Sequence, residues 1–381
     1  MMGHQFVAQN AHFKSMGINF DRPVTGAGAC ESSQERMPMP QDVTFDLPFD
    51  TPVSEHLARA REQHLRWVWE MGLVRSQAGF EEYQSWDLPQ AAARTYPYAS
   101  ADDMVVLMNW FSLAFLFDDQ FDSGSPDRAD RIAEVARELI ATPLRPAGTP
   151  PRVVCPITTA WAEVWAHLSD GMSLTWRTRF AASWGRFLVA HTEEVDLAAK
   201  GRAGTLGIEE YAEFRRRTVG IHHSIDAGER SRGFEVPAQV QAHGLMVRMR
   251  DLAADTIGFM NDIHSFEREK RRGDGHNLIA VLHRERGCSW EEAADEAYRM
   301  TTECLDEYLE LEALVPGMCE ELGLGTEQRD QVRMGVEAIQ HWINGNYEWA
   351  LTSGRYSAAK EGPAATAELA GRGSLDDLLA V

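Results

Sequence analysis

The sequence contains few cysteines and no long apolar segment, and each absence excludes a class of protein. Its five cysteines form no CxxC pair, so they predict neither a zinc site nor a disulfide framework, and reduced thiols fit best. No run of about 18 apolar residues occurs, and no basic stretch followed by an apolar core opens the chain. We therefore expect no membrane span and a cytoplasmic protein. The cysteines are Cys30, Cys155, Cys288, Cys304 and Cys319.

Basic residues are scarce relative to acidic ones. The chain has 37 Lys and Arg against 58 Asp and Glu, which gives a formal net charge of -21. Such a charge repels nucleic acids and anionic lipid surfaces, so neither is expected as a partner. An anionic small molecule would have to be captured by local cations and metal ions, because the overall field opposes its approach.

Strand-type alternation is also scarce, and helical periodicity takes its place. A chain of 381 residues with 44% hydrophobic content can bury one large core or two modest ones, and we predict one all-α domain over residues 47–356. We expect residues 1–46 to form a flexible N-terminal extension and residues 357–381 to form a C-terminal tail. The proline-rich segment 142–152 is interpreted as a connection within one helical bundle. Helical patterns cover residues 100–121, 161–195, 208–225, 236–271, 290–314 and 327–351.

Oxygen-bearing side chains recur at helical spacing in two segments. Asp118 and Asp122 share one helix face at 3.6 residues per turn, and Asn261, Ser265 and Glu269 share a face of another helix. Carboxylate, amide and hydroxyl oxygens favour Mg²⁺ over zinc, and Mg²⁺ commonly shares its shell with substrate phosphates. Two such stripes facing each other predict a clamp for a diphosphate.

The two segments together resemble, in the same order, the metal-binding motifs of bacterial class I terpene synthases (terpene cyclases). Further matches are Arg216 within a run of three arginines, Arg268, and the pair Arg355 and Tyr356 after a Trp-rich segment. The resemblance extends over residues 47–356. It implies a single-domain α-helical bundle with a central cavity, a cluster of three Mg²⁺ ions, and a linear prenyl diphosphate as substrate.

The resemblance also implies a role for each matched residue. Ionising an allylic diphosphate requires charge to be drawn onto the leaving group, which metal ions and fixed cationic donors achieve in the transition state. The metal ligands would be Asp118, Asp122, Asn261, Ser265 and Glu269. The donors to diphosphate oxygens would be Arg216, Arg268, Arg355 and Tyr356, with arginine favoured for its bidentate fork.

Gly220 lies four residues after Arg216, inside a helical pattern. A helix-interior glycine costs about 1 kcal/mol relative to alanine, so it predicts a helix break near the cavity. In the terpene synthases that the sequence resembles, a helix break at the matching position directs a backbone carbonyl at the prenyl chain that reacts. The histidines His222, His223 and His264 are not assigned as general bases, because the released diphosphate can accept the proton.

Aromatic side chains without nucleophilic lone pairs would stabilise a carbocation in a dry pocket. The candidates are Phe115, one turn before Asp118, and Trp342 and Trp349, which share a helix face leading to Tyr356. Ordinary core packing explains such a stripe equally well.

The sequence alone does not decide the length of the substrate, and it leaves two alternative functions to consider. The small Ala114 one turn before Asp118 suggests a roomy pocket, which suits a C20 substrate, geranylgeranyl diphosphate, and a diterpene product. We nevertheless expect C15 farnesyl diphosphate and a sesquiterpene, the commoner activity among bacterial relatives. The alternatives are a prenyl chain-elongating synthase, against which the Asn261 segment argues, and a non-catalytic acidic helical scaffold whose ligand stripes are solvated charge. A homodimer is left open.

Overall fold

The computed structural model describes residues 43–50, 52–122, 129–200, 204–272, 275–357 and 378. All regular structure in these ranges is helical, which confirms the all-α prediction. Most of the predicted extension and tail lies outside these ranges. The helices are α2 (Leu57–Glu70), α3 (Gln77–Trp86), α4 (Leu88–Thr95), α5 (Ala101–Asp122), α6 (Ala129–Ala141), η3 (Thr142–Leu144), α7 (Pro156–Leu168), α8 (Leu174–Ala199), α9 (Ile208–Thr218), α10 (Ile221–Arg232), α11 (Ala238–Gln241), α12 (Gly244–Arg272), α13 (Leu278–Arg286), α14 (Trp290–Glu312), α15 (Val315–Glu321), α16 (Thr326–Ala350) and α17 (Gly354–Ser357).

Two of the predicted helical patterns are divided in the structure at places where no break was predicted. Residues 161–195 belong to α7 and α8, which separate near Gly171, a glycine with a φ of 74°. Residues 236–271 belong to α11 and α12. The proline-rich segment begins as η3, which contacts α6, α7 and α8. This segment therefore connects helices that pack together, as predicted.

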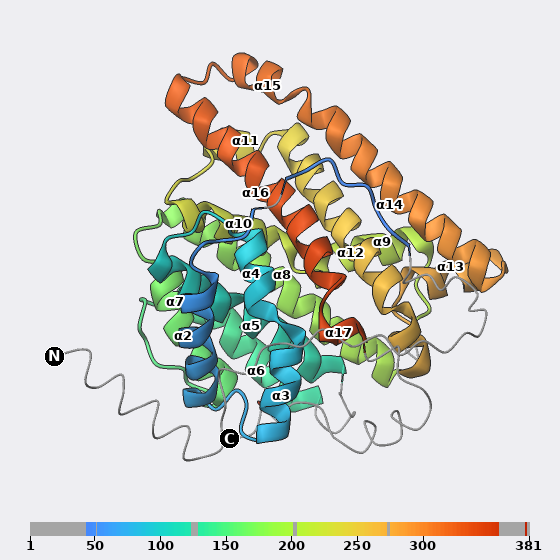
Figure 1. The fold of residues 1–381 in the computed structure, drawn as a ribbon, viewed down its shortest axis with the longest axis horizontal. Coiled ribbons are helices and arrows are strands. Elements are labelled where there is room, and N and C mark those ends of the chain that lie inside the picture. The colour runs from blue at the N-terminus through green and yellow to red at the C-terminus, as the bar shows by residue number, and fades with distance from the viewer. Residues whose placement is uncertain are drawn as a thin grey trace.

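The helices that carry the predicted ligands lie in the middle of the bundle. α5 is apolar over most of its surface, so it lies buried among α2, α4 and α7. α12 packs along α14 and also contacts α16, and Figure 1 shows these long helices side by side. α16 in turn packs against α4 and α10, and the short α17 follows it and contacts α3 and α12. These contacts direct parts of α5, α12, α16 and α17 toward one interior space.

The contact between α4 and α16 depends on a glycine. A Cβ atom built on Gly345 would lie 2.9 Å from the carbonyl carbon of Arg94 and 3.0 Å from its oxygen. Both are backbone atoms, so neither can move aside without shifting α4. Gly345 therefore permits an approach between these helices that no other residue type would allow.

Residues 43–46, predicted as part of a flexible extension, pack on the helical body. The Phe45 side chain is buried, its ring stacks on Tyr298 at 4.9 Å, and its backbone N–H donates to the Tyr347 hydroxyl at 2.8 Å. Residues 43–46 therefore pack on the same body as the residues that follow the predicted boundary.

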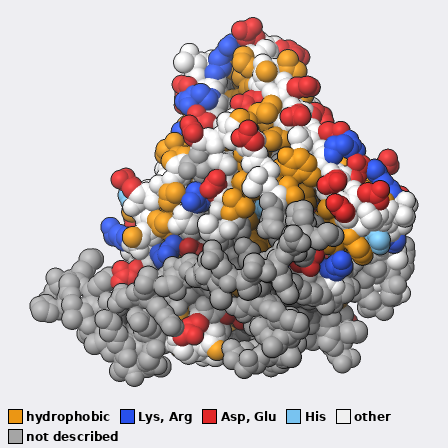
Figure 2. Space-filling view, turned by 45° about the vertical axis from the view of Figure 1, so that its right-hand side comes forward, with side chains coloured by type: hydrophobic (Ala, Val, Ile, Leu, Met, Phe, Trp, Pro, Cys, Tyr) orange, Lys and Arg blue, Asp and Glu red, His pale blue; other side chains and the backbone are white. Residues whose placement is uncertain are grey.

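Within the described residues, no helix is long and apolar enough to cross a membrane. On the face shown in Figure 2, acidic side chains are spread over the upper part of the molecule among smaller groups of basic ones. This distribution matches the net negative charge of the chain.

Candidate active site

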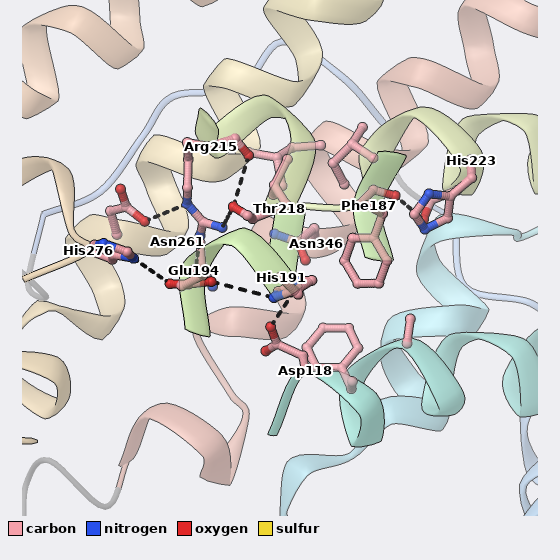
Figure 3. A pocket seen from close by; sticks show the side chains of 18 of the residues that line it. Asp118, Phe187, His191, Glu194, Arg215, Thr218, His223, Asn261, His276 and Asn346 are labelled. Atoms are coloured by element: carbon pink, nitrogen blue, oxygen red, sulfur yellow. Dashed lines mark hydrogen bonds and ion pairs between the residues drawn. The ribbon is translucent and has the colours of Figure 1, made fainter. Parts of the chain in front are cut away.

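An interior cavity lies between α5, α8, α9, α10, α12, α16 and α17 (Figure 3). The cavity together with its open mouth encloses about 1100 Å³. Its mouth is lined by charged and polar side chains, whereas aromatic side chains form much of the inner wall. This combination suits a ligand with an anionic head and an apolar body.

The predicted ligand stripe on α12 borders the cavity. Asn261 and Glu269 line it, and Asn261 is held by two hydrogen bonds, donating to the Tyr356 hydroxyl at 2.7 Å and accepting from Arg215 at 2.7 Å. Between them, the buried Ser265 hydroxyl has no hydrogen-bond partner among the described residues. A buried hydroxyl is rarely left unsatisfied, so an orphan oxygen flanked by an amide and a carboxylate fits a hard divalent cation.

Asp118 brings the second ligand segment to the same cavity. Its carboxylate accepts a hydrogen bond from Arg355 at 3.3 Å and lies 3.6 Å from the His191 ring. The structure therefore brings together Asp118 and the α12 stripe, which are far apart in sequence. Asp122 is the last residue of α5, and its side chain lies outside the described part of the structure.

The three consecutive arginines point in different directions, and the one that reaches the cavity is not the predicted one. Arg215 lines the cavity and donates to Asp262 at 2.9 Å as well as to Asn261. Arg216 does not line it and instead pairs with Asp255 at 2.6 Å. Arg217 pairs with Glu193 on α8.

A signal in the sequence distinguishes Arg215 from its neighbours. The buried residues of α9 are Tyr211, Phe214 and Thr218, and Arg215 lies four residues after the first and three before the last. It therefore shares the inward face, whereas Arg216 is rotated about 100° from it. Burial is the largest single influence and would lower the pKa of Arg215, but the charge of Asp262 together with those of Tyr211, Glu269 and Asp118 raises this pKa.

The other predicted diphosphate ligands gather at the mouth. Arg268, Arg355 and Tyr356 all line the cavity. The guanidinium of Arg268 lies 5.8 Å from the centre of the Tyr356 ring, and that of Arg355 lies 5.4 Å from the centre of the Phe115 ring. These side chains and Arg215 provide directed N–H and O–H donors around one opening, as an anion requires.

A histidine and glutamate network that joins α8 to the segment before α13, which the sequence did not predict, borders the side of the predicted metal ligands (Figure 3). Glu194 lies 2.6 Å from His276 and 3.5 Å from His191, which also faces Asp118. Burial would raise the pKa of Glu194, but hydrogen bonds from the two histidines outweigh burial and lower it. Glu194 is therefore ionised beside the mouth. No local pattern in the sequence marks these residues.

The aromatic wall includes two of the three predicted rings. Phe115 and Trp342 line the cavity, and Phe111, which the sequence reasoning missed, stacks between them at 5.0 and 5.4 Å. Trp349 does not line the cavity. It packs edge-on against Phe115 at 5.3 Å, and its buried N–H donates to the Trp86 carbonyl. Trp349 thus supports the wall from behind.

The predicted helix break at Gly220 is confirmed. Gly220 has a φ of 74° and separates α9 from α10, and it lines the cavity. Of the three histidines considered, only His223 lines the cavity, where burial lowers its pKa to about 3. His222 pairs with Asp251 outside the cavity, and His264 stacks on Tyr347.

Comparison with known proteins gives consistent matches. A family profile described as "Terpene synthase family 2, C-terminal metal binding" matches residues 109–307. A 7-epi-alpha-eudesmol synthase ((2E,6E)-farnesyl diphosphate cyclizing) of Streptomyces viridochromogenes is 82% identical over 343 residues, 90% of this chain and 100% of that protein. The crystal structure of an a-eudesmol synthase matches with a TM-score of 0.79 and 82% identity, over 82% of this chain and 100% of the other. That of germacradien-4-ol synthase from Streptomyces citricolor matches with a TM-score of 0.72 and 31% identity, over 82% and 99%.

Proposed function

This chain belongs to the terpene synthase family, and from that premise we propose that it ionises (2E,6E)-farnesyl diphosphate and cyclises the carbocation to a sesquiterpene. The observation that carries the proposal is the meeting of Asp118 with the α12 ligand stripe at the mouth of an aromatic-walled cavity. The 82% identical relative, whose name specifies that substrate, supports it.

The metal of the proposed reaction is Mg²⁺, with three ions as the expected number. Asp118 and Asp122 would hold ions from the α5 side, and Asn261, Ser265 and Glu269 would hold one from the α12 side. The orphan Ser265 hydroxyl supports this assignment. Bound Mg²⁺ would supply positive charge that stabilises the departing diphosphate.

The chain's own donors orient the leaving group. Arg268, Arg355 and Tyr356 keep their predicted role, and Arg215 replaces Arg216, because only Arg215 faces the cavity. Arg215 also bonds Asn261, so it connects the metal-binding side to the diphosphate. The inner wall of Phe111, Phe115 and Trp342 presents ring faces to the cation and excludes water from most of its path.

The name of the 82% identical relative denotes an alcohol. We therefore expect this chain to form a product that carries a hydroxyl group, with its oxygen supplied by water. A C20 substrate and diterpene product is the second candidate, favoured by the small Ala114 in the cavity wall. The family match leaves no support for a chain-elongating synthase or a scaffold. Assembly as a homodimer and a cytoplasmic location stay predictions.

The test is incubation of the purified chain with C10, C15, C20 and C25 prenyl diphosphates and Mg²⁺, followed by gas chromatography with mass spectrometry. We expect the C15 substrate to give cyclic products, EDTA to stop the reaction, and added Mg²⁺ to restore it. Preferential turnover of the C20 substrate would replace the sesquiterpene assignment with the diterpene one. Absence of diphosphate release from every substrate would refute the proposed function.

A further inference from the structure

Among the described side chains of the inner cavity wall, only Asn346 has a polar group that is accessible from the cavity and forms no hydrogen bond to the protein. It lies on α16, one turn after Trp342, and lines the cavity although the residue is only 7% exposed. Figure 3 shows it inside the pocket between α9 and the α5 side. No described residue forms a hydrogen bond with its carboxamide. An amide in an aromatic cavity is costly unless something satisfies it.

The other polar groups of the inner wall are either hydrogen-bonded to protein groups or too deeply buried for water to reach them. The Ser224 hydroxyl donates to the Gly220 carbonyl at 2.8 Å, and the Thr218 hydroxyl is shared between the Arg215 carbonyl and guanidinium. The Nε2 atom of His223 has no partner but is fully buried, so a water molecule cannot reach it. Asn346 alone in this group offers a donor and an acceptor that water can contact.

We propose that Asn346 holds the water molecule that captures the final carbocation, which makes Asn346 the residue that determines whether the product is an alcohol. This inference rests on the proposed cyclase function. An ordered water bonded to a polar wall group is a normal component of such a site. The Asn346 carboxamide oxygen accepts a hydrogen bond from one O–H group of the water. A lone pair on the water oxygen then stays directed at the cation.

The capture step balances without any further reagent. The water oxygen forms a C–O bond to the cationic carbon, and the resulting oxonium loses one proton. The diphosphate released in the ionisation step takes that proton, so the products are the alcohol and protonated diphosphate. A cation not reached by the water loses a proton from carbon to the same diphosphate and leaves as a hydrocarbon. The ratio of alcohol to hydrocarbon therefore measures the water's placement.

The experiment compares Asn346→Leu, which has similar volume and no polar atom, with the wild type and with Ser224→Ala. Each protein is incubated with farnesyl diphosphate and Mg²⁺ in H₂¹⁸O, and the label and the alcohol-to-hydrocarbon ratio are measured. We expect ¹⁸O in the wild-type alcohol, a ratio lowered about tenfold in Asn346→Leu, and a ratio within about twofold of wild type in Ser224→Ala. Asn346→Ser, which keeps a polar group, should give an intermediate ratio.

Several results would overturn the assignment. An unchanged ratio in Asn346→Leu would mean that the carboxamide only stabilises charge, and an equal loss in Ser224→Ala would mean that the water lies elsewhere. A wild type that releases diphosphate but forms only hydrocarbons would refute the inference while leaving the cyclase function intact. A wild type that releases no diphosphate would refute the function itself. Thermal unfolding checks folding, and Asn346→Leu should unfold no earlier than wild type, because it removes an amide that no described protein group satisfies.

Discussion

Replacing Arg215 by lysine should reduce turnover far more than the same replacement at Arg216. Arg215 uses its fork to bond Asp262 at 2.9 Å and Asn261 at 2.7 Å while it borders the cavity. A lysine ammonium keeps the charge but cannot hold these two partners and the diphosphate together. The loss of one directed donor in the transition state corresponds to about 2 to 4 kcal/mol, or roughly 30- to 1000-fold in kcat/KM.

Arg216→Lys is the matched control, because it makes the same change one residue away. The Arg216 side chain is 28% exposed and pairs with Asp255 outside the cavity. Lysine keeps the positive charge beside the buried Asp255 carboxylate, so most of this ion pair is retained. We therefore expect less than about a fivefold change in kcat/KM at this position.

The assay is steady-state diphosphate release from farnesyl diphosphate with saturating Mg²⁺, with thermal unfolding of both variants as the folding check. Lysine is preferred to alanine at residue 215, because alanine would leave the buried Asp262 carboxylate unpaired at a cost of about 3 to 5 kcal/mol in stability. Equal losses in the two variants, or a larger loss in Arg216→Lys, would refute the assignment of Arg215 to the diphosphate.

Three further expectations test the ligand stripe, the cavity wall and the buried histidines. The double variant Asn261→Ala with Ser265→Ala should release no diphosphate while its far-UV circular dichroism stays unchanged; near-normal turnover would contradict the metal assignment. Ala114→Phe places a ring in the cavity one turn before Asp118, so C20 turnover should fall more than C15 turnover and the C15 products should change; an identical product profile would show that the ring does not meet substrate. Burial lowers the pKa of His64 to about 4 from 6.5, so the unfolded state binds the proton first as pH falls. His64 should therefore contribute about 2 to 3 kcal/mol to the stability lost between pH 7.5 and 4.5, measured by urea unfolding as the difference between the wild type and a His64 variant that still folds; an equal loss in both proteins would contradict it.

The sequence predicts the helices better than it predicts which side chains face inward. The sequence pattern located α5, α14 and α16 closely, because α14 and α16 each have a long buried stripe and α5 is apolar over most of its surface. The Asn261, Ser265 and Glu269 spacing also needed no tertiary information, since all three lie on one face of one helix. Trp349 shares a face with Trp342, yet it lies in a second layer, because its N–H is bonded to a carbonyl of α3. Periodicity identifies the buried face of a helix but not the depth of each side chain within the interior.

The arginine run and the histidine and glutamate network illustrate two different limits. Selecting Arg215 over Arg216 required the phase of α9, which the buried Tyr211 and Thr218 provide. Glu194 and His276, in contrast, come from segments that only the tertiary fold brings together. No spacing rule within either segment could have joined them.

Gly345 can influence which product forms although it does not contact the substrate. Its missing Cβ sets how near α4 lies to α16, and α16 carries both Trp342 and Asn346. Any side chain at residue 345 would have to push against the Arg94 backbone and so move the wall from outside. Natural variation or directed evolution can therefore reshape the reaction chamber through the packing of two helices, and a mutant library restricted to cavity-lining positions would never sample that route.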